Sequence, residues 1–288
     1  MKVCLFWNRG AGEGQSLAEV TTWIQDAGHR VDRVVRDPSD LPHTSHAEVD
    51  AVVAAGGDGT VAIAARALAG SDVPLAVLAL GTANNIAESL GLQTSPQVAI
   101  AAWAHQHVVH IDAGIIQDAE GESPFFESVG AGLIAAAIAR GNATISSDDG
   151  VPEQLQQARD MYVDLIGSVA ASHFEIAIDG TTIEGDYLLV EVLNMPSVGP
   201  NVRLTSEVNP ADGLLSVVVA AESDRPALAA YLGTRAIGES SDAALKSWRG
   251  SKITITGLID FHVDDQLRTG DGRKVTIGIK PAHLPVLA

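Results

Sequence analysis

The stretch Val49-Asp50-Ala51-Val52-Val53-Ala54-Ala55-Gly56-Gly57-Asp58-Gly59-Thr60 decides the fold class of this chain. An apolar run typical of a buried strand ends in a glycine turn, and a helical pattern then continues to about Ala69, before Gly70. The same order recurs after apolar runs at Val3–Trp7 and Val73–Leu80. Repeated strand, glycine turn and helix predict a doubly wound α/β domain, a parallel sheet with helices on both faces, over residues 1–112.

The helix after the first turn carries its own start and stop signals. Ser16 and Glu19 have the spacing of a capping box, and Gly28 follows the last apolar residue of the helical stripe. A further strand is predicted at Val31–Val35.

From residue 113 the pattern changes to short strands separated by turn clusters. One helix is expected around Leu155–Val169 and another around Pro226–Gly233. The strands are predicted at Phe174–Ile178, Tyr187–Leu193, Leu214–Ala220, Ser251–Thr256, Phe261–Val263 and Lys274–Ile279. This half, residues 113–288, is therefore predicted to be an antiparallel β-sandwich-like domain with a helical insertion.

Composition and charge exclude several classes of protein. The chain has 288 residues, 46% hydrophobic and 19% charged, so it has ample material for two cores and too little charge for a disordered chain. Its net charge of −18 argues against nucleic acid as a partner and against simple electrostatic docking on an anionic bilayer. The single cysteine, Cys4, excludes an internal disulfide framework and favours a reducing compartment.

No apolar stretch approaches the ~20 residues that a membrane-spanning helix needs. The N-terminal apolar run, Val3–Trp7, is too short for a signal peptide. A cytoplasmic protein is expected, and a homodimer is left open.

Three glycine turns at the ends of predicted parallel strands are the strongest functional signal. Such turns meet at one edge of the sheet, and each offers backbone N–H groups and a helix N-terminus to an anion. Together they favour a nucleotide site over glycines that merely end strands. They are formed by Asn8, Arg9, Gly10, Ala11 and Gly12, by Gly56, Gly57, Asp58, Gly59 and Thr60, and by Gly81, Thr82, Asn84 and Asn85.

The carboxylate of Asp58 is unusual among phosphate-binding glycines, because it would repel the ligand. It suits a residue that reaches Mg²⁺ through water or a ribose hydroxyl, and the alternative is a turn residue or helix cap. Arg9 has two similar interpretations, as a phosphate ligand or as a solvated side chain.

These motifs resemble the diacylglycerol kinase catalytic family, which includes bacterial lipid kinases and is related to sphingosine, ceramide and NAD kinases. The resemblance rests on Gly-Gly-Asp-Gly-Thr, on Leu80-Gly81-Thr82-Ala83-Asn84-Asn85, and on the order of the later motifs. Those later motifs are Ile111-Asp112-Ala113-Gly114, Phe125-Phe126, Asn209-Pro210-Ala211-Asp212-Gly213-Leu214-Leu215 and Val263-Asp264-Asp265-Gln266.

The resemblance implies transfer of a phosphoryl group from ATP to a lipid or other long-chain alcohol, with Mg²⁺ as cofactor and transient contact with the inner membrane surface. The three glycine turns would bind ATP. Asn209, Asp212 and Leu214 map onto the family's magnesium-binding stretch, and Asp264, Asp265 and Gln266 map onto the motif that carries its base. From the residues alone, Asp212-Gly213 is equally typical of a hairpin turn.

Two amides depart from the family pattern. Asn85 replaces an Asp, and Gln266 replaces the Glu of an Asp-Gly-Glu motif whose Gly is here Asp265. Because an amide is a poor proton acceptor, Asp264 is the preferred base. An NAD kinase and a nucleotide-binding regulatory protein without turnover remain the alternatives.

Overall fold

The computed structural model describes residues 1–7, 15–41, 48–92, 95–105, 107–141, 150–234 and 242–288. The chain divides into two compact units, unit 1 (Met1–Asp112 with Pro281–Ala288) and unit 2 (Ala113–Lys280). The segment Pro281–Ala288, which the sequence interpretation assigned to the second domain, packs with unit 1. None of the helices within the described ranges is long and apolar enough to cross a bilayer.

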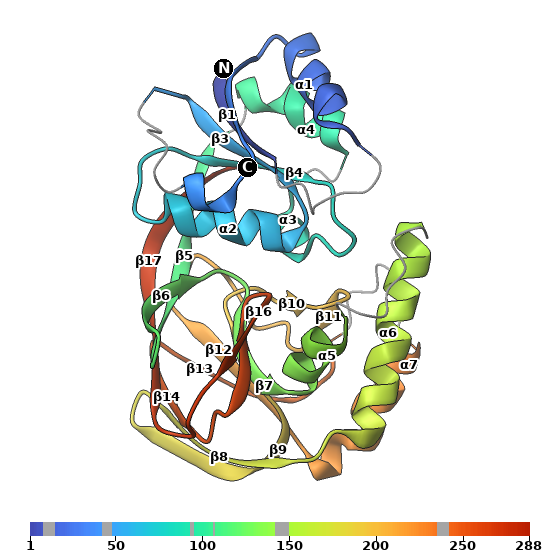
Figure 1. The fold of residues 1–288 in the computed structure, drawn as a ribbon. Coiled ribbons are helices and arrows are strands. Elements are labelled where there is room, and N and C mark those ends of the chain that lie inside the picture. The colour runs from blue at the N-terminus through green and yellow to red at the C-terminus, as the bar shows by residue number, and fades with distance from the viewer. Residues whose placement is uncertain (8–14, 42–47, 93–94, 106, 142–149, 235–241) are drawn as a thin grey trace. The chain divides into compact units, whose positions relative to one another are not determined.

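Unit 1 is built on a parallel sheet in the order β4–β3–β1–β2 (Figure 1). Its strands are β1 (Lys2–Trp7), β2 (Arg30–Val35), β3 (Ala51–Gly56) and β4 (Leu75–Ala79), and the end of β17 (Val275–Leu287) lies parallel to β4. Its helices are α1 (Leu17–Asp26), α2 (Asp58–Leu68), α3 (Asn85–Ser89) and α4 (Pro96–Ala102), with 3-10 turns η1 (Pro38–Asp40) and η2 (Trp103–His105).

Helices cover both faces of this sheet. Val20 and Ile24 of α1 and Ile100 of α4 share one apolar cluster with alternate residues of β1, β3 and β4, whereas α2 packs against the opposite face (Figure 1). Because helices cover both faces, side chains on both sides of the central strands are buried. Consecutive residues of these strands, such as Val52 and Val53, are therefore apolar. The doubly wound α/β prediction is confirmed.

The capping box predicted for the first helix is present. The Ser16 side chain accepts from the Glu19 N–H at 3.2 Å, and the Glu19 carboxylate accepts from the Ser16 N–H at 2.7 Å. The Ser16 N–H and the Ser16 hydroxyl, the latter at 2.8 Å, both donate to the Glu19 carboxylate and hold its pKa below the ordinary value.

Unit 2 is dominated by antiparallel pairing, as predicted. Its central strand β9 pairs with β7, β8 and β12, and the ladder continues from β8 to β14 and β17 and from β7 to β15 and β16. The strands are β6 (Gly121–Phe125), β7 (Ser128–Gly132), β8 (Ser172–Ile178), β9 (Thr181–Leu193), β10 (Ser197–Val198), β11 (Val202–Arg203), β12 (Leu215–Ala221), β13 (Lys246–Gly250), β14 (Lys252–Thr256), β15 (Asp260–Val263) and β16 (Gln266–Thr269), with β5 (Val108–Asp118) entering from unit 1.

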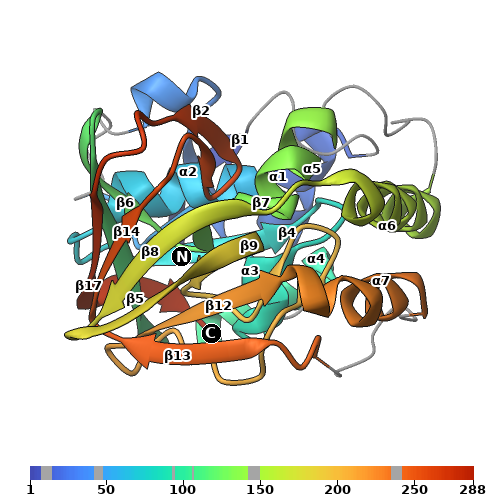
Figure 2. The same ribbon diagram turned by 90° about the horizontal axis from the view of Figure 1, so that it is seen from below.

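Two apolar cores lie on opposite faces of this sheet. One is formed by the strands themselves, with Phe125, Val190 and Phe261 among its members. In the other, α5 (Leu133–Gly141), α6 (Val151–Ser168) and α7 (Arg225–Thr234) pack on the sheet, and α6 and α7 lie side by side (Figure 2). The 3-10 turn η3 (Glu222–Asp224) precedes α7. This is the β-sandwich-like domain with helices that the sequence predicted.

Candidate active site

The second and third glycine turns of unit 1 meet backbone to backbone. β3 ends at Gly56 and β4 at Ala79, and the Leu80 N–H donates to the Gly56 carbonyl at 3.0 Å. A Cβ on Gly81 would lie 2.3 Å from the Gly57 Cα, and a Cβ on Gly57 would lie 3.1 Å from the Gly81 Cα. Both positions therefore need glycine because the two loops touch through their main chains.

Asn84 shapes the third turn from within. Its backbone is left-handed, with φ 52° and ψ 40°, a conformation that Asn tolerates better than most residues. Its side-chain Oδ1 accepts from the Gly81 N–H at 3.0 Å, and its Nδ2 donates to the Gly81 carbonyl at 2.8 Å. Asn84 thus holds the loop that precedes α3, and Asn85 begins that helix as a buried residue.

Asp58 connects the two turns. It is the first residue of α2, and its Oδ1 accepts from the backbone N–H of Ile86 in α3 at 2.9 Å. Gly57, and not Asp58, is the N-cap of α2, and this oxygen of Asp58 instead caps the N-terminus of α3. The interpretation of Asp58 as a residue that reaches Mg²⁺ or a ribose hydroxyl stays a prediction. Thr60 is buried within the first turn of α2, and Gly57 gives that helix no side-chain cap. The first turn, Asn8–Gly12, lies outside the described residues. The two interpretations of Arg9, as a phosphate ligand or a solvated side chain, therefore both stay open.

Asp264 lies at the tip of the β15–β16 hairpin in unit 2 and is 3% exposed. Its φ is 52°, and its Oδ1 accepts from the backbone N–H groups of Phe126 at 3.0 Å and Glu127 at 2.8 Å. Its own N–H donates to the Ser128 carbonyl at 2.8 Å. The hairpin tip is therefore tied to the segment that leads into β7.

The other two residues of this motif are placed differently. Asp265 and Gln266 are exposed, and Gln266 pairs with Val263 at the start of β16. Burial thus distinguishes Asp264 from the other two residues of the motif, Asp265 and Gln266.

The predicted magnesium residues lie in a turn that is already closed by other contacts. Asn209 Oδ1 accepts from the Ala211 N–H at 3.1 Å, and Asp212 Oδ1 accepts from the Leu214 N–H at 3.1 Å. Asp212 Oδ2 forms an ion pair with the Arg249 guanidinium from β13. No group of three or more His, Cys, Asp or Glu residues within the described ranges could hold a metal ion. With the residues as they lie, Arg249 supplies the positive charge beside Asp212, and the assignment of Asn209, Asp212 and Leu214 to Mg²⁺ stays a prediction.

This arrangement predicts that Mg²⁺ without nucleotide leaves the melting temperature of the wild type unchanged. Arg249→Gln should cost about 1 kcal/mol or less, since both partners of the pair are partly exposed, and should let Mg²⁺ raise the melting temperature by binding Asp212. Thermal unfolding with Mg²⁺ and with a chelator measures both. A wild-type rise with Mg²⁺ that Asp212→Asn abolishes would show that the metal displaces Arg249.

Two further motifs have structural explanations. Gly114 of β5 pairs with Phe125 of β6, and a Cβ on Gly114 would lie 2.1 Å from the Phe125 ring, so the ring covers the glycine. Asp112 is buried, and its Oδ1 accepts from the Ala282 N–H at 2.8 Å. Gly114 and Asp112 thus contribute to the packing of their own units.

The sequence interpretation missed two buried charged residues beside Asp264. Glu191 of β9 is 0% exposed and His262 of β15 is 1% exposed, and His262 Nε2 lies 2.9 Å from Glu191 Oε1. The sequence contains one sign of a buried charge here, because Glu191 is the single charged residue in the apolar run Leu188–Leu193.

Comparison with known proteins gives the family of the chain. Residues 2–116 match the model of the diacylglycerol kinase catalytic domain, and residues 128–287 match that of the YegS C-terminal NAD kinase beta sandwich-like domain. The chain belongs to the family of proteins that join a diacylglycerol kinase catalytic domain to a YegS C-terminal NAD kinase beta sandwich-like domain. The order of the two matched domains is the one that the motifs predicted.

Individual relatives agree with this assignment. The chain is 29% identical over 241 residues to a diacylglycerol kinase of Mycobacterium tuberculosis (strain CDC 1551 / Oshkosh), covering 79% of this chain and 75% of the relative. It is 27% identical over 276 residues to a "Probable lipid kinase YegS-like" of Klebsiella pneumoniae (strain 342), covering 91% and 88%.

Among solved structures, a diacylglycerol kinase from Bacillus anthracis str. Sterne has a TM-score of 0.75 at 21% identity, covering 99% of this chain and 96% of that one. An NAD kinase from Archaeoglobus fulgidus in complex with ATP has a TM-score of 0.56 at 12% identity, covering 100% and 94%. At these identities the two structures show a shared fold.

Proposed function

We propose that this protein is an ATP-dependent kinase that transfers the γ-phosphoryl group to the hydroxyl of diacylglycerol or a similar lipid alcohol. The observation that carries the proposal is the direct backbone contact between Gly57 and Gly81. The two βα turns pressed together without side chains lie at the carboxyl edge of a parallel sheet, where a polyphosphate can approach the main chain. The N-terminus of α2, which Gly57 leaves without a side-chain cap, is the anion-binding feature at this edge. Family membership and the diacylglycerol kinase among the relatives support this choice.

In the proposed reaction the lipid hydroxyl oxygen attacks the γ-phosphorus of ATP. The new oxygen–phosphorus bond forms as the bond between the γ-phosphorus and the β,γ-bridging oxygen breaks, and ADP leaves. The hydroxyl proton passes to a carboxylate. Phosphoryl transfer needs little more from the protein than positioning, charge stabilisation and this base.

Asp264 is the proposed base. The N–H groups of Phe126 and Glu127 hold its Oδ1, which fixes the position of the carboxylate that is proposed to take the proton. Asp265 is exposed and stands at a position where the family has glycine, which makes it a poorer choice, and Gln266 cannot serve at neutral pH.

The acceptor class is tested with γ-labelled ATP and Mg²⁺ against three candidates, namely short-chain diacylglycerol, a sphingoid base and NAD. Transfer to diacylglycerol is the expected result. Transfer to NAD in the absence of lipid would replace the proposal with an NAD kinase. ATP binding measured by calorimetry, with no transfer to any acceptor, would leave a nucleotide-binding regulatory protein.

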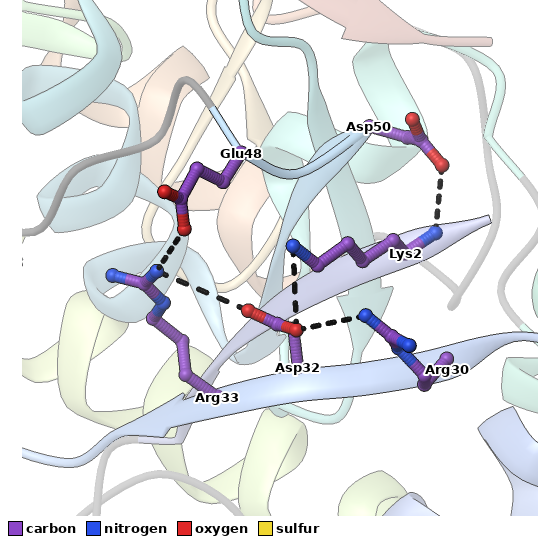
Figure 3. Close-up of polar contacts among 6 residues, drawn as sticks. All are labelled: Lys2, Arg30, Asp32, Arg33, Glu48 and Asp50. Atoms are coloured by element: carbon purple, nitrogen blue, oxygen red, sulfur yellow. Dashed lines mark hydrogen bonds and ion pairs between the residues drawn. The ribbon is translucent and has the colours of Figure 1, made fainter.

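Membrane encounter is proposed to be transient and not electrostatic. Lys2, Arg30 and Arg33 surround Asp32, with nitrogen–oxygen distances of 3.4, 3.1 and 3.9 Å (Figure 3). Glu48 also pairs with Arg33, and Asp50 accepts from the Lys2 backbone N–H. The cationic side chains of Lys2, Arg30 and Arg33 thus each lie close to a carboxylate, so these residues do not form a uniformly basic surface.

Sedimentation with anionic vesicles should therefore show weak binding that lowering the salt does not improve. The net charge of −18 repels the anionic vesicle surface. The basic residues around Asp32 are paired with carboxylates, so they offer no local basic patch that would overcome this repulsion. Tight binding that weakens steeply as salt rises would contradict this, and loss of that binding in Arg30→Gln/Arg33→Gln would locate the basic patch here.

A further inference from the structure

Three residues near Asp264, namely Glu191, Gly130 and His262, lie side by side on three neighbouring strands. Glu191 of β9 is paired with Gly130 of β7, and Gly130 is paired with His262 of β15. Partners in register project from the same face of a sheet. Glu191 and His262 thus lie on either side of a glycine, on the face that the helices cover.

The missing side chain of Gly130 lets the two outer residues meet. Strands two apart in a sheet are separated by about 10 Å, too far for most pairs to touch over an intervening side chain. Here His262 Nε2 lies 2.9 Å from Glu191 Oε1 and 3.2 Å from Oε2. A Cβ on Gly130 would fall 2.1 Å from Glu191 Oε1, within the space that the carboxylate occupies.

The other ring nitrogen of His262 faces Asp264. Nδ1 lies 2.8 Å from the Asp264 carbonyl oxygen, which only accepts, so Nδ1 must carry a proton and donate. With a carboxylate at Nε2, a doubly protonated ring satisfies both contacts. Burial by itself lowers the pKa of His262, but the Glu191 carboxylate and the bond to Asp264 raise it above its ordinary value.

We propose that the buried Glu191–His262 ion pair is the device that positions Asp264 at the hairpin tip. His262 holds the carbonyl of Asp264, while the N–H groups of Phe126 and Glu127 hold its carboxylate. Between them these contacts fix a residue whose φ of 52° is otherwise disfavoured. His262 and Glu191 are positioning residues, and the proposal rests on the proposed role of Asp264 as base.

Other ionisable groups surround this pair. Tyr162 of α6 is buried, and burial together with Glu191 and Glu127 raises its pKa well above the ordinary value. Arg159 is buried one turn earlier on the same face of α6, and Glu127 is buried before β7. The pair therefore stands in a dry and charged environment, where removing one partner is costly.

The first test is made on the wild type. Nitrogen-15 NMR of the imidazole at pH 7 should show both ring nitrogens of His262 protonated. A bare Nδ1 would overturn the contact with Asp264, and a bare Nε2 would overturn the ion pair.

The second test compares His262→Gln with His173→Gln. His173 is a matched control, since its two nitrogens also contact carboxylates, Asp186 at 2.9 Å and Glu184 at 3.2 Å, but it is exposed on β8. His262→Gln should lower kcat by up to about a hundredfold with KM for ATP unchanged, and should speed hydrogen exchange at the Phe126 and Glu127 amides. Wild-type turnover with wild-type exchange, or lost turnover with unchanged exchange, would overturn the proposal.

Gly130→Ala gives a third variant that alters no ionisable group. Its methyl group should separate Glu191 from His262 and reproduce both effects, so it remains informative where His262→Gln does not fold. Wild-type exchange at the Phe126 and Glu127 amides in folded Gly130→Ala would overturn the proposal. Asp264→Asn with full turnover would contradict the proposed base, whereas the exchange measurements test the positioning separately.

Discussion

Asp264→Asn is expected to lower turnover on the best lipid acceptor by roughly 10²–10⁴, the usual cost of losing a general base. Asn keeps the oxygen that accepts from Phe126 and Glu127, and it tolerates the left-handed backbone that Asp264 adopts. The substitution therefore removes the proposed proton acceptor with little change to the turn. Initial rates of γ-phosphoryl transfer measure the effect.

Two controls make this result specific. ATP affinity should be unchanged in Asp264→Asn, because the proposed base serves the acceptor hydroxyl. Asp265→Asn alters an exposed carboxylate next to it and should keep near wild-type turnover. The reverse outcome, an active Asp264→Asn and an inactive Asp265→Asn, would transfer the base role to Asp265.

Gln266→Glu is the converse of this experiment, because it restores the carboxylate that the family motif carries. Gln266 is exposed at the start of β16, so the fold should accept the change. Higher turnover would show that the missing carboxylate limits the rate, and unchanged turnover would support Asp264 as sufficient.

Gly57→Val is expected to weaken ATP binding at least about tenfold while the circular dichroism spectrum stays native. A Cβ at this position would already lie 3.1 Å from the Gly81 Cα, and the two methyl groups of valine would extend beyond it. The branched side chain would push the two turns apart and block the approach of a polyphosphate to the main chain. Isothermal titration calorimetry with ATP measures the change.

Gly167→Ala is the matched control for this substitution. Gly167 lies in α6, and a Cβ there meets nothing within 4 Å, so ATP affinity should stay at the wild-type value. Equal affinity in Gly57→Val and the wild type would remove this turn from the nucleotide site.

Local signals in the sequence predicted much of the fold. The capping box of Ser16 and Glu19 and the parallel pairing of the strands follow from short segments that can be interpreted alone, whereas the order of β1, β3 and β4 in the sheet was not predicted. The glycines at 57 and 81 also marked the two loops that contact each other at the ends of β3 and β4. Their physical reason, a direct contact between two backbones, depends on how the loops pack and cannot be derived from either segment alone.

The features that escaped the sequence interpretation are non-local. The contact of Glu191 with His262 joins residues 71 apart and depends on the register of three strands with Gly130 between them. Arg249 reaches Asp212 across 37 residues, so the partner of Asp212 could not be predicted from the turn at Asn209–Leu214 alone. The packing of the C-terminal segment Pro281–Ala288 with unit 1 is likewise a tertiary contact that the local sequence does not indicate.

The two amide departures now have different physical meanings. Asn85 is buried at the start of α3, where an ionised Asp would carry a desolvation cost that the amide avoids. Gln266 is exposed, so burial gives no reason for its lost charge. We therefore propose that, of the two, the departure at Gln266 is the one that affects turnover, and Gln266→Glu tests this.

The central claim, a phosphotransferase with a lipid alcohol as acceptor, is tested most directly by the balance between ADP released and lipid phosphate formed. Wild-type protein, ATP, Mg²⁺ and diacylglycerol in mixed micelles should yield one lipid phosphate monoester for each ADP, and both products should fall together in Asp264→Asn. ADP release that does not depend on diacylglycerol, with no phosphorylated lipid, would contradict the claim.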